Sequence, residues 1–156
     1  MSIEIERKFL VQSADWRSLA VSSRYISQGY ITDRASPSVR IRISGDDAWI
    51  TIKIGNNSIS RLEFEYEIPI LEASQMISSL PLDNQITKVR HLVPANGNLV
   101  WEIDEFEGNL AGLIMAEIEI SREGEEVYLP KWIGKEVTGD SRYLNSNLNS
   151  LLWQQG

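Results

Sequence analysis

Six segments of the chain carry two like charges separated by one residue, opposite an apolar face. These pairs are Glu4/Glu6, Arg40/Arg42, Glu63/Glu65, Lys88/Arg90, Glu102/Asp104 and Glu117/Glu119. In a β-strand, residues i and i+2 point to the same side and lie roughly 7 Å apart. Two like charges at that distance repel by about 2 kcal/mol at an effective dielectric near 20. Six such pairs are favourable only if something neutralises them.

The acidic pairs suit the metal, and the basic pairs suit the phosphates, of a metal-bound polyphosphate. Carboxylate pairs provide the oxygen ligands that divalent metals prefer. Arginine and lysine pairs suit phosphate oxygens, especially through the bidentate guanidinium. A polyphosphate that chelates a metal requires both kinds in one cavity. We therefore expect the charged rows to line a polar interior, with the apolar rows outside and wrapped by helices.

A plainer interpretation is an amphipathic barrel whose charged face meets solvent and carries cross-strand salt bridges. Solvent faces usually mix Ser, Thr, Asn, Gln and Lys, whereas these rows are dominated by Glu and Arg. The composition of the rows favours the interior interpretation.

Eight strands of alternating pattern can hold these pairs. The alternation predicts them over residues 3–11, 24–32, 39–44, 48–54, 60–68, 86–93, 99–106 and 113–121. Turn residues at Gly45-Asp46-Asp47, Gly55-Asn56-Asn57 and Asn96-Gly97-Asn98 indicate hairpins between several of them. The fold class is therefore α+β but mainly β, and the strand number is compatible with a closed antiparallel β-barrel.

Three shorter segments have helical patterns and could cover that barrel. A short capped helix is expected over residues 13–19 and a longer helix over residues 71–80. The tail from Trp132 is expected to begin as a loop and end in a helix that starts near Asp140. The apolar stripe of that helix would be Leu144, Leu148, Leu151 and Leu152.

Composition limits the class of protein. The 156 residues fit a single domain over 1–156. The chain has no cysteine, which excludes disulfides and thiolate metal sites and is compatible with the cytoplasm. No apolar run reaches the roughly twenty residues of a membrane helix, and no signal peptide precedes the first strand. The net charge of −7 argues against nucleic-acid binding through a broad basic surface.

The pattern Glu4-x-Glu6-x-Lys8 resembles the signature of the CYTH, or triphosphate tunnel metalloenzyme, family. The resemblance continues in order through Val39-Arg40-Ile41-Arg42, Thr51-Ile52-Lys53, Arg61-x-Glu63-x-Glu65, Lys88-x-Arg90, Glu102-Ile103-Asp104, Ala116-Glu117-Ile118-Glu119 and the tail from Trp132 to Asn145. It covers nearly the whole chain and is similar to the small bacterial inorganic triphosphatases. It implies an eight-stranded antiparallel tunnel that binds triphosphate and uses Mg²⁺ or Mn²⁺.

The resemblance also implies roles for individual residues. The metal ligands would be Glu4, Glu6 and Glu119, with Glu117, Glu102 and Asp104 beside them. The triphosphate-binding set would be Lys8, Arg40, Arg42, Lys53, Arg61, Lys88 and Arg90. Glu63, Glu65 and Asp104 would be catalytic and, with Glu102, would sit on the wall where a second metal or the attacking water could be held. Apart from the resemblance, Tyr30 could project inward and meet Lys88, which makes both further catalytic candidates. A lysine beside Tyr30 would favour its phenolate as a proton acceptor, although a plain hydrogen-bonded tyrosine is the alternative.

The expected activity is hydrolysis of a linear triphosphate, with inorganic tripolyphosphate giving pyrophosphate and orthophosphate. The alternatives are an adenylate cyclase or a nucleoside or thiamine triphosphatase on the same fold, or a polyphosphate-binding module without turnover. The expected partner is thus a small triphosphate, with no nucleic acid and no membrane, and a homodimer is left open.

Overall fold

The computed structural model describes residues 2–32, 37–55 and 60–149, and within them nine strands form one antiparallel sheet. The strands are β1 (Ser2–Val11), β2 (Ser22–Tyr30), β3 (Ser38–Ser44), β4 (Asp47–Ile54), β5 (Ser60–Glu67), β6 (Gln85–Pro94), β7 (Val100–Phe106), β8 (Ile114–Glu119) and β9 (Ile133–Glu136). Their order is β5-β4-β3-β2-β6-β7-β8-β1-β9. The expected eight strands are confirmed, and the ninth was not expected.

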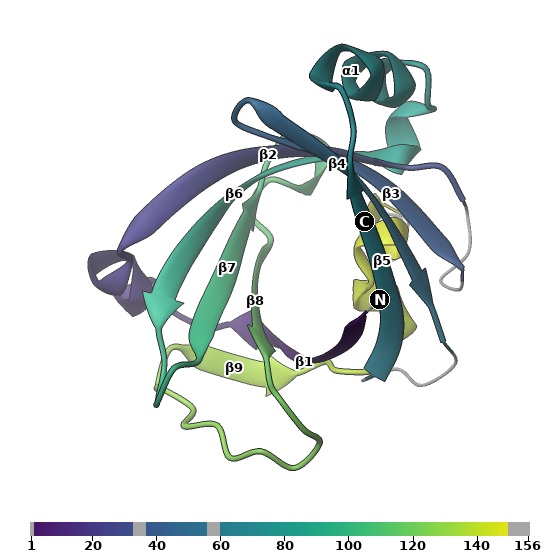
Figure 1. Cartoon of the computed structure of the whole chain (residues 1–156). Helices are drawn as coiled ribbons and strands as arrows, with labels where there is room; N and C mark the ends of the chain where they lie inside the picture. The colour runs from purple at the N-terminus through teal and green to yellow at the C-terminus, as the bar shows by residue number, and fades with distance from the viewer. Residues whose placement is uncertain (1, 33–36, 56–59, 150–156) are drawn as a thin grey trace.

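The first strand closes the barrel (Figure 1). Residues 2–5 of β1 pair with β5, which places Glu4 opposite Arg61. Residues 6–10 pair with β8, which places Glu6 opposite Glu119 and Lys8 opposite Glu117. Because β1 joins strands from both ends of the sheet, the sheet becomes a closed tube, as the sequence predicted.

The strand β9 corrects the expectation of a loop after Trp132. It pairs with the second half of β1, beyond the residues that β5 covers. Arg7, which interrupts the outer apolar row of β1, donates to both carboxylate oxygens of Glu136, at 2.9 and 2.8 Å. A strand of four residues is too short to show an alternating pattern in the sequence. Only its pairing with β1 identifies it as a strand.

The charged rows point into the tube. Strand register sets Arg40 opposite Thr51, and Thr51 in turn opposite Glu65. On the other side of the tube, Arg90 lies opposite Asp104 and Glu102 opposite Glu117. Successive residues of a strand alternate between faces, so the apolar rows point outward.

Two groups of residues cover much of the outer wall. Trp16 and Trp132 pack on the outward side chains of β1, β7 and β8, where Trp101 makes edge contacts with Phe9 at 5.5 Å and with Trp132 at 5.7 Å between ring centroids. The helix α1 (Ile70–Ser78) lies over β2, β3 and β4 (Figure 1). Its start and end agree with the predicted helix to within two residues.

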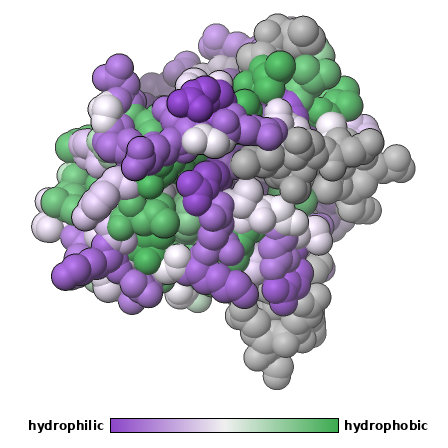
Figure 2. Space-filling model, turned by 90° about the horizontal axis from the view of Figure 1, so that it is seen from below, coloured by the Kyte–Doolittle hydropathy of each residue, from purple (hydrophilic) through white to green (hydrophobic). Residues whose placement is uncertain are grey.

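The wrapping is incomplete on the wall formed by β4, β5 and the start of β1. The outward side chains of Ile3 and Tyr66 are 62% and 57% exposed, and Ile54 and Leu62 are also exposed. Figure 2, which views the barrel from below, shows apolar side chains in patches between polar ones. Helices cover little of this part of the barrel, since α1 is the only α-helix of more than one turn among the described residues.

One end of the tunnel is filled by an apolar plug. Inward side chains of Tyr30, Ile86, Phe106 and Met115 pack there, and the cluster also contains Leu110, Val137 and Leu148. The tail that completes it was predicted as a helix from Asp140. It instead forms two 3-10 turns, Ser141–Tyr143 and Asn145–Asn147, of which the first is capped by the Asp140 side chain.

Among the described residues of the tail, only Leu148 and Asn149 are α-helical. Leu148 is buried as the predicted stripe requires, while Leu151 and Leu152 lie outside the described residues. The expected helix over residues 13–19 is likewise a 3-10 helix, Asp15–Leu19. Within the described ranges, no helix combines the length and apolarity that a membrane crossing would require.

Close packing of α1 on β2 depends on Gly29. A Cβ added to Gly29 would lie 2.7 Å from Leu80 Cδ1 and 3.4 Å from Ile77 Cγ1. We expect Gly29→Val to lower the free energy of unfolding by about 1–3 kcal/mol, the usual cost of overpacking. Urea denaturation of Gly29→Val, Leu80→Ala and the double variant measures the effect. The double variant should lose less than the sum of the two single losses, and simple additivity would contradict the contact.

Candidate active site

The interior of the barrel contains a charged cavity of about 170 Å³. Of the sixteen residues predicted for the site, all but Lys88 and Asp104 line it. They are Glu4, Glu6, Lys8, Tyr30, Arg40, Arg42, Lys53, Arg61, Glu63, Glu65, Arg90, Glu102, Glu117 and Glu119. Ser38, Thr51, Leu144 and Asn145 also line it and were not predicted. The structure thus brings together residues that are spread over more than a hundred positions of sequence.

The arginines of β3 form the most cationic part of the wall. Arg40 donates to Thr51 Oγ1 at 3.2 Å and lies 3.9 Å from Glu65. Within the described residues, Arg42 has no carboxylate partner and donates its Nε–H to Gln28 at 3.0 Å. Burial, and then repulsion by the neighbouring arginines, lowers the pKa of Arg42 to about 9. An uncompensated guanidinium in a partly buried wall is suited to bind an anion.

Farther round the same wall, Glu4 of β1 and Glu63 of β5 share a hydrogen bond near Lys53 of β4. Lys53 Nζ lies 2.8 Å from Glu4 and 3.8 Å from Glu63. Burial would raise the pKa of Glu4, but the hydrogen bond to Glu63 and the Lys53 charge lower it to about 2. The same hydrogen bond, and then burial, raises the pKa of Glu63 to about 7. A hydrogen bond between two carboxylates needs a proton, so Glu4 and Glu63 share one.

A second group of carboxylates has little compensation. Glu6 and Glu119 are direct partners on neighbouring strands, and like charges in that position destabilise a sheet. Glu6 has Arg61 at 4.0 Å, and no cation lies within ion-pair distance of Glu119 among the described residues. Burial, and then the charge of Glu117, raises the pKa of Glu6 to about 8. Burial also raises the pKa of Glu119, followed by the effect of Glu4.

These carboxylates fit a hard divalent cation by their chemistry. Oxygen-only donors are what Mg²⁺ and Mn²⁺ prefer, and a cation between Glu6 and Glu119 would remove their repulsion. In the described part of the chain, no three acidic or histidine side chains already lie close enough together to hold a metal ion. The chemical type of these donors therefore fits the metal. The described side chains are not already arranged around a metal position.

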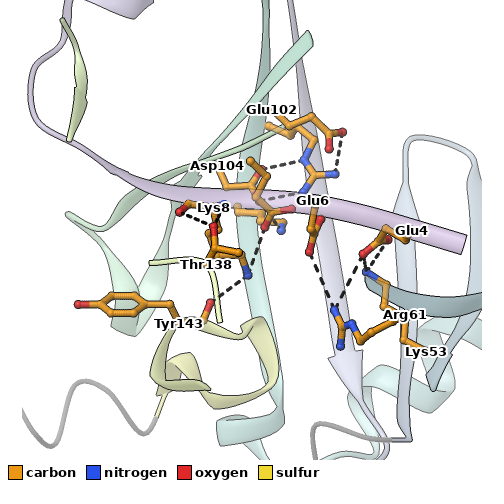
Figure 3. A network of polar contacts seen from close by, with 12 residues as sticks. Glu4, Glu6, Lys8, Lys53, Arg61, Glu102, Asp104, Thr138 and Tyr143 are labelled. Carbon is orange, nitrogen blue, oxygen red and sulfur yellow. Dashed lines mark hydrogen bonds and ion pairs between the residues drawn. The ribbon is translucent and has the colours of Figure 1, made fainter. Parts of the chain in front are cut away.

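Lys88 and Asp104 lie behind the cavity wall and hold Arg90. Lys88 Nζ donates to Asp104 Oδ2 at 2.6 Å, and Arg90 donates to both oxygens of Asp104 at 2.8 and 2.9 Å. Arg90 also reaches Glu102 at 3.1 Å, a contact that Figure 3 shows above the Asp104 carboxylate. Burial would raise the pKa of Asp104, but Lys88 and Arg90 lower it to about 2. This network positions Arg90, and the catalytic and ligand roles expected of Lys88 and Asp104 stay predictions.

The tail contributes directly to the cavity. Lys8 Nζ donates to the Tyr143 carbonyl at 3.1 Å and lies 3.6 Å from Glu117 (Figure 3). The Lys8 backbone N–H donates to Thr138 Oγ1 at 2.8 Å, which fixes the tail against β1. Asn145 lines the cavity, and its Oδ1 is buried without a hydrogen-bond partner. No charge pattern marks Asn145 in the sequence, so only the fold of the tail reveals it.

The Lys88–Asp104–Arg90 network should be essential for stability. Asp104→Asn removes the charge that compensates two buried cations, and breaking a buried pair from one side usually costs about 3–5 kcal/mol. Urea denaturation should show that loss, while Asp46→Asn, at an exposed turn, should leave the midpoint nearly unchanged. A loss of less than about 1 kcal/mol for Asp104→Asn would contradict the assignment.

The comparisons with known proteins agree on one family. The CYTH domain model matches residues 2–151. The chain is 46% identical over 148 residues to an inorganic triphosphatase of Acetivibrio thermocellus, covering 95% of this chain and 94% of that protein. It is 34% identical over 149 residues to an inorganic triphosphatase of Nitrosomonas europaea, covering 93% and 95%.

A solved structure has the same fold over nearly the same length. The crystal structure of the inorganic triphosphatase NE1496 superposes with a TM-score of 0.69 at 29% identity and covers 96% of this chain and 95% of its own. The family expected from the charged pairs is thereby confirmed. On the match of the domain model and the identity to both relatives, this chain belongs to the CYTH domain family.

Proposed function

We propose that this chain is a metal-dependent inorganic triphosphatase that hydrolyses tripolyphosphate to pyrophosphate and orthophosphate. The observation that supports this most is a cavity with uncompensated arginine on one wall and uncompensated carboxylates on another. The names of the two curated relatives agree with the proposal. The cytoplasmic location and the homodimer stay predictions.

The basic side chains bind the triphosphate. Arg40 and Arg42 of β3 line the cavity beside Lys53 of the neighbouring strand β4, and Arg61, Arg90 and Lys8 complete the set. Charge-assisted hydrogen bonds to phosphate are about twice as strong as neutral ones, and several of them fix the chain of phosphates in one orientation. Phosphoryl transfer needs positioning and neutralisation more than a protein nucleophile.

The acidic side chains facing Arg61 hold the metal. Glu6 and Glu119 are the first candidates because they are the least compensated, and Glu4, Glu102 and Glu117 lie next to them. When bound, Mg²⁺ or Mn²⁺ neutralises phosphate oxygens and lowers the pKa of a ligated water. These glutamates also keep other anions out of the acidic half of the cavity.

Glu65 on β5 is placed to accept the proton of the attacking water, since its neighbour Glu63 already shares a proton with Glu4. Thr51 donates to Glu65 at 2.8 Å and orients that carboxylate. The water oxygen forms a bond to the terminal phosphorus as the bond from that phosphorus to the bridging oxygen breaks. Pyrophosphate leaves with the bridging oxygen, and the released proton goes to Glu65.

A second candidate substrate is a triphosphate that carries an organic group. At the end of the tunnel away from the plug, a hollow of about 320 Å³ shares Arg42 and Arg90 with the charged cavity. Trp49, Ile26 and Arg24 line it. An aromatic or cationic group could pack there while its phosphates lie deeper, which favours a nucleoside or thiamine triphosphate.

A phosphate-release assay distinguishes these activities. Tripolyphosphate, ATP and thiamine triphosphate are each tested with Mg²⁺, Mn²⁺ and Ca²⁺ and with EDTA, and cyclic AMP is measured in the ATP samples. We expect tripolyphosphate to be hydrolysed fastest and EDTA to abolish the release, because basic side chains that suit phosphates and carboxylates that suit a metal line the same cavity. Formation of cyclic AMP would favour a cyclase. Binding without phosphate release would favour a non-catalytic module.

The metal assignment is tested by neutralising its two carboxylates. Glu6→Gln and Glu119→Gln should each reduce metal-dependent turnover at least about 100-fold, more than the usual effect of changing a residue behind the ligands. The thermal midpoint should stay equal or rise, since each change removes like-charge repulsion. Glu72→Gln, on α1, is the matched control. Activity within a factor of two of the wild type in both variants would refute the assignment.

A further inference from the structure

An uncharged residue, Gln28, lies among the charged side chains of the tunnel wall. It faces the interior on β2, opposite Arg42 of β3, and its exposure is 0%. Its Oε1 accepts from Arg42 Nε at 3.0 Å, and its Nε2 donates to the Tyr30 hydroxyl oxygen at 3.2 Å. One buried amide therefore joins two residues that both line the cavity.

The direction of this hydrogen-bond chain is fixed by Arg42. A guanidinium group has donors and no acceptor. Turning the Gln28 amide by 180° would place its Nε2 hydrogens against the Nε–H of Arg42, and the bond to Arg42 would be lost. Oε1 therefore faces Arg42 and Nε2 faces Tyr30. The Tyr30 oxygen must act as an acceptor in this bond.

The Tyr30 hydroxyl consequently keeps its own proton for another partner. A phenol has one O–H donor and accepts through its lone pairs. Within residues 2–32, 37–55 and 60–149, no acceptor lies within hydrogen-bond distance of that proton. Tyr30 is nearly buried, at 6% exposure, so bulk water has little access to the group. A buried donor without an acceptor is costly unless a ligand provides one.

Arg42 is in the same situation on the other side of the amide. Its Nε is used by Gln28, and the described residues offer its remaining N–H groups no carboxylate. Both ends of this chain of hydrogen bonds, Tyr30 and Arg42, thus direct free donors into one cavity. A phosphate group, with several acceptor oxygens and a negative charge, is the ligand that satisfies both.

We propose that Gln28 is a positioning residue that directs the Tyr30 hydroxyl and the Arg42 guanidinium to the same phosphate of the substrate. The inference rests on the proposed function, and it makes Tyr30 a hydrogen-bond donor in place of a proton acceptor. Lys88, the expected partner of a Tyr30 phenolate, donates to Asp104 instead.

A double-mutant cycle tests this chain of hydrogen bonds. Tyr30→Phe alone should raise the KM for tripolyphosphate about 10-fold, as expected for a lost hydrogen bond to a charged group. Gln28→Glu keeps an acceptor for Arg42, but the new carboxylate also accepts the Tyr30 proton and turns it away from the cavity. In that background, Tyr30→Phe should change the KM by less than a factor of two. The same cycle is measured for the Kd of tripolyphosphate by calorimetry.

Two further variants separate positioning from folding. Gln28→Met keeps the volume of the side chain without the amide and should raise the KM about 10-fold or more in a protein that is still folded, with a lower thermal midpoint because the Arg42 Nε–H loses its acceptor. Gln75→Met, on the exposed face of α1, should change neither quantity. A uniform loss of stability in all Gln28 variants, with the KM unchanged in the folded fraction, would overturn the positioning role.

The outcomes distinguish this inference from the proposed function. If the wild type hydrolyses tripolyphosphate and Tyr30→Phe has the same effect in both backgrounds, Gln28 does not direct Tyr30 and only the inference fails. If the wild type binds tripolyphosphate without turnover, the proposed function fails and the Kd cycle still decides the inference. If it neither binds nor hydrolyses tripolyphosphate, both fail.

Discussion

The pairing of β1 with two strands from distant parts of the chain is the constraint on which the rest of the structure depends. Residues 2–5 meet β5 and residues 6–10 meet β8, so the charged row of β1 is enclosed between the charged rows of both neighbours. Once enclosed, these charges are separated from bulk water, and the interactions among them strengthen. Each charge must then find a partner within the wall or in a ligand.

The interior charges divide into two groups, according to whether a partner within the protein lies close to them. In one group, protein partners are close: Lys88 and Arg90 with Asp104, and Lys53 with Glu4. These pairs stabilise the wall and hold its side chains in place. In the other group, Arg42, Glu6 and Glu119 have weak or distant compensation. The second group is where binding a metal and a triphosphate would relieve the most repulsion, which links the folding of the barrel to the proposed activity.

The two ends of the tunnel differ in polarity. The plug formed by Tyr30, Phe106, Leu148 and their neighbours is apolar, and the opposite end opens into a hollow that contains Trp49 and Arg24. A highly charged ligand is excluded from an apolar plug by the cost of desolvation. For the proposed activity, a linear triphosphate thus enters with one end first. The tail that completes the plug also contributes Asn145 and the carbonyl that Lys8 contacts.

The sequence by itself determined which residues face the interior, because alternation along a strand is a local property of the backbone pleat. It also supported the family, the eight barrel strands and fourteen of the eighteen residues that line the cavity. It did not distinguish Glu102 from Asp104, which share one face of β7, although Glu102 lines the cavity and Asp104 is buried under Lys88 and Arg90.

That difference depends on the register between β6 and β7, which no single strand encodes. The same reason applies to β9, whose four residues become a strand only beside β1, and to Gln28, whose role depends on Arg42 lying opposite it. Local pattern decided the face of each residue. Only the tertiary structure decided its neighbours, because strand register and the path of the tail depend on contacts between residues far apart in the chain.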